Sequence, residues 1–332
     1  MRRNLHLWIL SFSGLAVIVA YPHLFGIYYT NFFVKFAIFG MYAVSLNLLL
    51  GYMGVLSFGH AIFFGTGAYA TALALTHISG LSLIPALLIG GFSGGILALI
   101  LSLLLVRVSG TAFAMLTLAF GQLLFVFALK FRNITGGEDG IGGYPIPSLN
   151  IPGIVSIDML EQTNFYYFAI TVIAVSIWMM WFYTRTPFGS LLVGIRDNEN
   201  RVDYMGFRLP HTKAVNLIVS GTFAGISGGL YALFQNLVST VGILDIHTSF
   251  YPIMMSYIGG IGNFFGPVLG SAILHILEDV TFRFTERVDL VTGLVFILVV
   301  LFAPQGIAGV FSNIRERFVA RAAGQPAVEG GI

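Results

Sequence analysis

The stretch LIPALLIGGFSGGILALILSLLLV, residues 83–106, contains 24 residues and none of them is charged. A helix needs about 20 predominantly apolar residues to cross the hydrocarbon core of a bilayer, so this stretch is long enough to be a membrane span. The whole chain of 332 residues is 57% hydrophobic and only 9% charged, far from the average of soluble proteins. These values predict an all-α polytopic membrane protein. The chain has no cysteine, which excludes disulfides and thiolate metal sites, and we expect no metal site.

Eight apolar segments have the length and composition of membrane spans. The first follows Arg2 and Arg3 and could be a signal peptide, but no small-x-small cleavage site follows it. We therefore expect an uncleaved first span with the N-terminus inside. Eight spans return the C-terminus to the inside, in agreement with its basic residues Arg315, Arg317 and Arg321. The segments are 7–21, 34–50, 61–76, 83–106, 112–129, 165–183, 214–236 and 288–303.

Residues 251–279 form a further apolar segment that is interrupted in its middle. The interruption reads GGIGNFFGP, residues 259–267, and the proline at its end cannot continue a helix. A ninth full span would also place the basic C-terminal tail outside. We therefore expect a re-entrant pair, 251–260 and 266–279, whose arms both return to the outer side. Broken backbone at membrane depth is tolerated only inside protein or beside a watery cavity.

The distribution of charge agrees with this topology. Eleven of the 16 basic residues fall inside and nine of the 14 acids fall outside, as the positive-inside rule requires for basic residues. We expect a membrane domain over 1–312, an outer loop at 130–164, a cytoplasmic loop at 184–213 and a cytoplasmic tail at 313–332. The inner basic residues are Arg2, Arg3, Arg107, Arg185, Arg196, Arg201, Arg208, Lys213, Arg315, Arg317 and Arg321, and the outer acids include Glu138, Asp139, Asp158, Glu161, Glu278 and Asp279.

Glycine interrupts a second apolar segment, GYMGVLSFGHAIFFGTGAYA at residues 51–70. Interrupted hydrophobic segments in corresponding positions of two halves indicate a transporter's substrate path, although a single glycine can also serve close helix packing. Because both halves contain such a break, we interpret them as parts of a translocation path. The expected path residues are Gly51, Gly54, Ser57, Gly59, His60, Gly259, Gly260, Gly262, Asn263 and Gly266.

Small residues at helical spacing predict where helices pack, because lipid supplies no hydrophobic force between them. Gly221, Gly225 and Gly229 repeat the GxxxG pattern, and Gly90 and Gly94 give another copy of it. Thr117 shares a helix face with Gly110, Ala114 and Gly121. Ser227, in GISGG, resembles the GxSG of rhomboid-type intramembrane proteases, but it lies in a span without the strand–turn–helix of a hydrolase nucleophile. We expect a packing role for it. The packing residues are Gly110, Ala114, Gly121, Gly221, Gly225 and Gly229.

Motifs of several enzyme and carrier classes are absent. None of the three lysines follows a glycine, so the chain has no Walker A loop, and it has no HExxH. No acid lies near the middle of a proposed full span, since Asp289 is only the second residue of 288–303, whereas a proton-coupled secondary carrier usually keeps one. His60 and His275 could replace such an acid, but a lone intramembrane histidine is more often structural.

The loop at 184–213 contains eight of the chain's 30 charged residues. Thr186 followed by Pro187 predicts a helix start. Asp197 and Asn198 interrupt this helix and can cap a second short helix through Met205, which Gly206 stops. Asp197 and Arg201 are spaced i,i+4 and form an expected weak pair. A solvated linker needs no such caps, so we expect a firm, charged helix that docks into a soluble partner.

Five motifs resemble LivM-type permeases of branched-chain amino acid ABC importers, and they occur in the same order over about residues 40–310. They are NLLLGYMGVLSFGHAIFFGTGAYATAL (47–73), SGTAFAMLTLAF with NITGGEDGI (109–120 and 133–141), TPFGSLLVGIRDNENRVDYMGFRLPHTKAVNLIVSGTFAGISGGLYAL (186–233), GGIGNFFGPVLGSAIL (259–274) and LFAPQGIAGV (301–310).

This resemblance implies an ABC importer permease fold in a bacterial inner membrane. It also implies a second, LivH-type permease, two cytoplasmic ATPases of the LivG and LivF type and a periplasmic binding protein. ATP and Mg would bind the ATPases, with no cofactor on this chain, no catalytic residue and no nucleic acid partner; membrane lipid surrounds the spans.

The family's coupling helix falls in the loop at 184–213, on Arg196, Asp197, Asn198, Glu199, Asn200, Arg201, Met205 and Gly206. Urea or another small solute is an alternative substrate, because similar permeases carry such solutes. A rhomboid-like protease or a secondary carrier is the alternative of another class.

Overall fold

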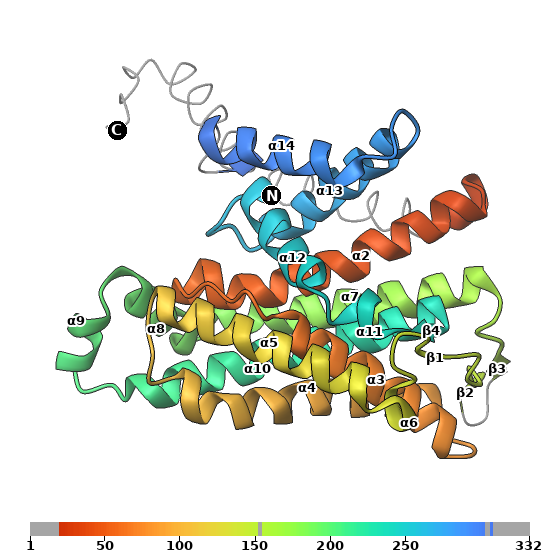
Figure 1. Cartoon of the computed structure of the whole chain (residues 1–332), viewed down its shortest axis with the longest axis horizontal. Coiled ribbons are helices and arrows are strands. Elements are labelled where there is room, and N and C mark those ends of the chain that lie inside the picture. Colours follow the sequence, from red (N-terminus) through yellow and green to blue (C-terminus); the bar gives the residue numbers. More distant parts are fainter. Residues whose placement is uncertain (1–19, 152–154, 303–305, 308–332) are drawn as a thin grey trace, which may run out of the picture.

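The computed structural model describes residues 20–151, 155–302 and 306–307, and this part of the chain is mostly helical (Figure 1). Within it, five helices are long and apolar enough to cross a membrane: α2 with its π-helical extension η1, α4, α5, α7 and α10. The helices are α2 (Ile27–Asn47), η1 (Leu48–Tyr52), α3 (Ala61–His77), α4 (Leu83–Leu105), α5 (Thr111–Lys130), α6 (Arg132–Thr135), α7 (Gln162–Arg185), α8 (Pro187–Asp197), α9 (Glu199–Tyr204), α10 (Leu209–Gln235), α11 (Thr240–Ile243), α12 (Ile246–Gly259), α13 (Gly266–Phe282) and α14 (Val288–Phe302).

Seven of the eight predicted spans coincide with helices, and the remaining one, 7–21, lies outside the described residues except for its last two positions. α3 has 17 residues and α14 has 15, fewer than the ~20 that a span needs. α2 begins at Ile27 instead of 34, and α10 begins at Leu209 instead of 214. Hydropathy identifies only the apolar part of a helix, and both of these helices continue into polar residues at their N-terminal ends.

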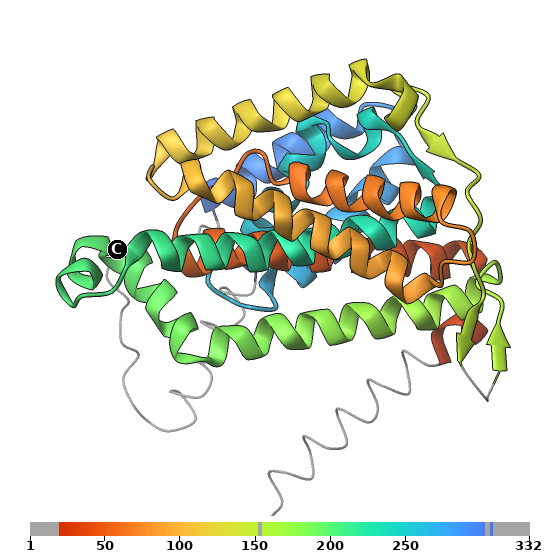
Figure 2. The ribbon, with the colours of Figure 1, turned by 90° about the horizontal axis from the view of Figure 1, so that it is seen from below.

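Short strands, which the all-α prediction did not include, organise one end of the bundle. β1 (Ile141–Gly142) pairs with β4 (Leu237–Val238), and β2 (Leu149–Ile151) pairs with β3 (Val155–Ile157), both antiparallel. The first pair ties the 130–164 loop to the chain that follows α10. Figures 1 and 2 show the strands at one end of the bundle, and α8 and α9 at the opposite end.

Glycines bring α3, α4 and α10 into close contact. A Cβ atom on Gly225 would lie 2.6 Å from the carbonyl oxygen of Gly90, and one on Gly94 would lie 2.5 Å from that of Gly221. No side chain fits at these distances, so the two backbones touch directly. Van der Waals contact of this kind is a main source of helix association within a membrane.

Side chains of α10 hold α2 and its extension η1 by donating hydrogen bonds to their main-chain carbonyls. Their order along α10 is the reverse of their order along α2, so the two helices run antiparallel. Measured interhelical hydrogen bonds in a membrane protein average roughly 0.6 kcal/mol each. The bonds run from Asn216 to Leu48 (2.8 Å), from Ser220 to Ser45 (2.6 Å) and from Ser227 to Ile38 (2.7 Å).

The apolar segment at 251–279 folds into two helices, α12 and α13, with a break at 260–265. Gly260 and Gly262 adopt φ angles of 114° and 95° there, which glycine tolerates far better than residues with a Cβ. The two helices cross closely, since a Cβ on Gly270 would lie 1.8 Å from the carbonyl oxygen of Met255. They form a hairpin against α2. The closed end of the hairpin lies beside the C-terminal end of α2, where Asn47 Nδ2 donates to the carbonyl of Asn263 at 3.1 Å.

Candidate coupling site

The cytoplasmic loop predicted at 184–213 folds into the two helices α8 and α9. α8 begins at Pro187, and it turns Leu192 and Ile195 inward, where both are buried. Asn198 ends α8 and caps α9, since its Oδ1 accepts a hydrogen bond from the amide of Arg201 at 3.0 Å. The helices thus form where the sequence predicts them. Thr186 makes no side-chain cap; its hydroxyl donates back to Tyr183 instead.

An ion pair fixes α9 to the N-terminal end of α10. Lys213 Nζ donates to Glu199 Oε1 at 2.6 Å, and the lysine side chain is only 7% exposed. The predicted pair between Asp197 and Arg201 is wrong, because Asp197 contacts its neighbour Arg196 at 3.1 Å. A break between α8 and α9 at Asn198 removes the helical spacing on which the predicted pair depends. Glu199, and not Asp197, therefore carries the contact that holds the loop.

The face of α9 that points away from the bundle is exposed, and so is the C-terminal end of this helix. Asn200, Arg201 and Asp203 lie on this surface, and Gly206 ends it with a φ of 86°. Tyr204 is 89% exposed and Met205 is 68% exposed, so two large apolar side chains project among charges. Sequence reasoning identified Met205 but missed Tyr204 and the exposed Phe207, because aromatic residues are too frequent in this chain to give a signal. An exposed apolar patch with a polar rim is typical of a protein-interaction surface.

Arg196 connects this loop to the membrane helices. Its Nη1 donates to the carbonyl of Gly51 at 2.7 Å, within the π-turn η1. A Cβ on Gly54, at φ 73°, would lie 2.7 Å from Cγ of Arg196, and one on Gly262 would lie 3.9 Å from its Nη1. Short π-helical segments are frequent at functional sites. The glycine breaks of the two halves therefore meet at one point, and the loop at 184–213 contacts both.

The other expected path residues lie within packed protein. A Cβ on Gly59 would lie 1.9 Å from the carbonyl of Thr117, and one on Gly259 would lie 1.8 Å from that of Gly266. His60 is fully buried and its Nε2 contacts Ser45 Oγ at 3.0 Å. These positions are close backbone contacts, whereas Gly54, Gly262 and Asn263 are exposed. The packing interpretation thus applies to the buried members of the set, and the path role of the exposed ones stays a prediction.

Three buried polar atoms near this point have no hydrogen-bond partner within the described residues. They are Asn47 Oδ1, Ser57 Oγ and His60 Nδ1. A buried polar atom without a partner costs about 1–3 kcal/mol, so such atoms are rare in stable folds. They are concentrated between the end of α2 and the start of α3, where the described residues leave polar groups without partners.

Most of the predicted packing residues lie in close helix contacts, but one of them is exposed. Gly221, Gly225 and Gly229 lie where α10 meets α3 and α4, Gly121 faces Gly59, and Ala114 is buried. The packing role predicted for Gly110 is wrong. This glycine precedes α5 with φ 62°, it is exposed, and a Cβ there would meet no atom within 4 Å. Its role is a turn that starts the helix, since a left-handed conformation favours glycine.

The bundle of apolar helices, with interrupted helices and a rigid loop tied to their ends, defines a multi-pass membrane protein of the transporter class. The chain belongs to the family described as branched-chain amino acid transport system / permease component, whose model matches residues 28–302. No solved structure matches the chain.

Three relatives show the range of this family. The high-affinity branched-chain amino acid transport system permease protein LivM of Salmonella typhimurium is 26% identical over 88% of this chain and 73% of its own length. LivH, named as a permease of the same system in that organism, is 23% identical over 82% of this chain and 91% of its own length. The guanosine ABC transporter permease protein NupQ of Bacillus subtilis is 32% identical over 38% of this chain and 39% of its own length.

Proposed function

We propose that this chain is one of two permease subunits in an ATP-driven importer of branched-chain amino acids. The family match supports the transport role, and the similarity to LivM over most of the chain supports the substrate class. Salmonella typhimurium has two permeases named for one such system, so a LivH-type chain is the expected second subunit. A periplasmic binding protein delivers the substrate, and two cytoplasmic ATPases bind ATP and Mg.

The contact of Arg196 with Gly51 is the observation that carries the coupling mechanism. The exposed face of α9 binds an ATPase subunit, and the ion pair with Lys213 prevents α9 from moving independently of α10. When the ATPases close, α8 and α9 move as a unit. Arg196 transmits this movement to η1 and to the break at 260–265, the two interrupted segments that line the inner end of the path.

The proposed topology has eight spans and a re-entrant pair in the bacterial inner membrane. The N-terminus, the loop at 184–213 and the C-terminus face the cytoplasm. α12 and α13 enter from the outer side and leave on the outer side, with their break beside the C-terminal end of α2. The hairpin against α2, with Asn263 at its closed end, supports this arrangement.

Nucleosides are the second candidate substrate class, because NupQ shares one region with this chain. A urea-type solute is a further alternative. The protease alternative is weaker, since the hydroxyl of Ser227 is fully buried and donates to a main-chain carbonyl of α2. A nucleophile needs a neighbouring base and access to substrate.

Reconstitution tests this proposal. The chain is co-expressed with the second permease, the ATPases and the binding protein encoded beside it, and the complex is placed in liposomes. We expect leucine, isoleucine or valine to stimulate ATP hydrolysis and to accumulate inside, and guanosine and urea to do neither. Import of guanosine without import of any branched-chain amino acid would assign the substrate to the nucleoside class.

A further inference from the structure

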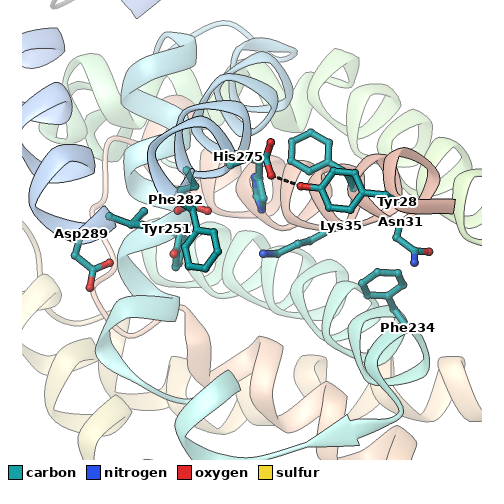
Figure 3. Close-up of a pocket in the computed structure, with 12 residues that line it drawn as sticks. Tyr28, Asn31, Lys35, Phe234, Tyr251, His275, Phe282 and Asp289 are labelled. Carbon is teal, nitrogen blue, oxygen red and sulfur yellow. Dashed lines mark hydrogen bonds between the residues drawn. The ribbon is translucent and has the colours of Figure 1, made fainter. Parts of the chain in front are cut away.

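An open cavity of about 490 Å³ lies at the end of the bundle opposite α9 (Figure 3). It is formed by the N-terminal end of α2, the C-terminal ends of α10 and α13, and the start of α14. Its walls combine aromatic rings with charges of both signs, which is an unusual composition for a surface that faces lipid. The residues that matter below are Lys35, Phe234, Tyr251, Glu278, Phe282 and Asp289.

The charged side chains of this cavity neutralise one another only in part, because Lys35 acts on Glu278 through space and Glu278 shares a hydrogen bond with Tyr251. Lys35 forms neither an ion pair nor a hydrogen bond within the described residues, although Glu278 lines the same space. Figure 3 shows Lys35 extending across the cavity between Phe234 on one side and Tyr251 with Phe282 on the other. Asp279 differs from these two, because it is paired with Arg283 at 2.7 Å and also accepts from Tyr28. Lys35 and Asp289 thus have neither an ion pair nor a hydrogen bond within the described residues, and Glu278 keeps a second carboxylate oxygen beyond its bond with Tyr251.

A second cavity adjoins the first one. It has a volume of about 280 Å³ and shares Tyr251, Glu278 and Asp289 with it. Thr292 lines this second cavity and is only 6% exposed. Its hydroxyl has no hydrogen-bond partner within the described residues. The two acids therefore lie between two spaces, one of which contains an unused hydrogen-bonding group. Such a group requires a partner that the described chain does not provide.

We propose that this cavity binds the zwitterion of an aliphatic amino acid on its way into the membrane domain. The ammonium of Lys35 binds the ligand carboxylate, Glu278 with Asp289 binds the ligand ammonium, and Phe234, Tyr251 and Phe282 surround its aliphatic side chain. This inference deepens the proposed function and rests on it. A few fixed polar groups in an otherwise apolar wall are the usual composition of a small-molecule site.

The pair of opposite charges distinguishes the candidate ligand classes. A free amino acid carries a positive and a negative group on one carbon, so it satisfies both Lys35 and Glu278. A nucleoside such as guanosine is neutral and would leave both charges without a partner, although its base could stack on the aromatic rings. Leaving a buried polar group unpaired is the feature that makes a site reject an otherwise similar ligand.

Protection of a single cysteine tests the site directly, because the chain has none of its own. Val288 lines the cavity, whereas Phe284 is 86% exposed and does not. In the purified complex, L-leucine is expected to slow maleimide labelling of the Val288→Cys chain several-fold and to leave labelling of the Phe284→Cys chain unchanged. Leucinol, which lacks the carboxylate, 4-methylpentanoate, which lacks the ammonium, and guanosine are expected not to protect.

Charge variants identify the groups involved. In the Val288→Cys background, Lys35→Met is expected to raise the leucine concentration for half-protection about tenfold or more, as the loss of a hydrogen bond to a charged group predicts. Lys35→Arg should restore protection, and Glu278→Gln should weaken it. Equal protection by leucine and leucinol, protection by guanosine alone, or equal protection of the Phe284→Cys control would overturn the assignment.

The liposome assay separates this inference from the proposed function. If the complex imports leucine but leucine never protects the Val288→Cys chain, the cavity is not a substrate site and the function stands. If leucine protects the Val288→Cys chain but is not imported, the cavity is an amino acid site and the proposed function is wrong.

Discussion

At the scale of single residues, Glu199 and Arg201 show how similar sequence signals hide different environments. Both are charged residues of α9, and the family resemblance places both on the helix that is expected to dock into a soluble partner. Arg201 fits such a docking surface, since it is exposed. Glu199 does not, because its carboxylate is the partner of Lys213, whose side chain is buried. Charge patterns identify the loop, but they do not show which charge faces inward.

This difference leads to a paired prediction. Glu199→Gln should lower the stability of the assembled chain by about 1–3 kcal/mol, because it weakens a hydrogen bond to a charged, buried group. Arg201→Gln should change stability by no more than about 0.5 kcal/mol, as exposed substitutions usually do, yet weaken binding of the ATPases. Thermal unfolding of the purified chain, together with co-purification of the ATPases, measures both effects. If the two variants unfold alike, the ion pair does not hold α9.

At the scale of secondary-structure elements, the sequence predicted the helices better than it predicted their contacts. Long apolar segments and the breaks at Gly206 and Gly260 were visible because they depend on local composition and backbone conformation. The hydrogen bonds from α10 to α2 were not visible, since Asn216 and Ser220 carry no signal that names their partners. Gly110 was misassigned for a related reason: spacing along a helix cannot show that the helix begins one residue later.

The same limits apply to the candidate site and its surroundings. The loop at 184–213 was predicted from its charges and caps, all of which are local. The position of Arg196 against Gly51 joins residues 145 positions apart, and no local pattern encodes such a contact. Lys35 was overlooked because it lies inside an apolar segment, where hydropathy averages it away. Only the fold brings it to the same cavity as Glu278.

Ser227 gives the prediction at this scale, because it lies where α10 packs against α2. Ser227→Ala removes one hydrogen bond to Ile38 and leaves the small volume unchanged, so it should cost roughly 0.6 kcal/mol and preserve transport. Ser227→Leu places a large side chain into a fully buried position and should prevent assembly. Size-exclusion profiles and leucine uptake distinguish the two. Loss of uptake in a well-assembled Ser227→Ala chain would instead support a catalytic role for the hydroxyl.

At the scale of the whole molecule, α2 and η1 connect the two candidate sites. The cavity with Lys35 lies near the N-terminal end of α2, and Gly51, the partner of Arg196, lies near the end of η1. The 26 residues from Ile27 to Tyr52 span roughly 39 Å at 1.5 Å per residue, about the full thickness of a bilayer with its interfaces. In the proposed topology, the cavity proposed for substrate and the surface proposed for the ATPases thus lie on opposite sides of the membrane.

Two exposed positions at the opposite ends test this orientation. Tyr204 on α9 and Phe284 after α13 are 89% and 86% exposed, so burial does not limit their reactivity once each is replaced by cysteine. They serve better than Asp279, which is held by Arg283, or Glu316, which lies outside the described residues. An impermeant maleimide added to intact cells should label the Phe284→Cys chain and leave the Tyr204→Cys chain unlabelled until the membrane is permeabilised.

The labelling of these two cysteine chains decides between the re-entrant pair and a ninth span. Protection of the Phe284→Cys chain in intact cells would mean that the segment 251–279 crosses the membrane once, which restores nine spans and contradicts the re-entrant pair. Labelling of the Tyr204→Cys chain from outside would place α9 where no cytoplasmic ATPase can reach it, and the coupling role of Arg196 would then fail as well. The expected pattern requires both arms of the α12–α13 hairpin to return to one side. Their break then remains beside the C-terminal end of α2, where Arg196 reaches it.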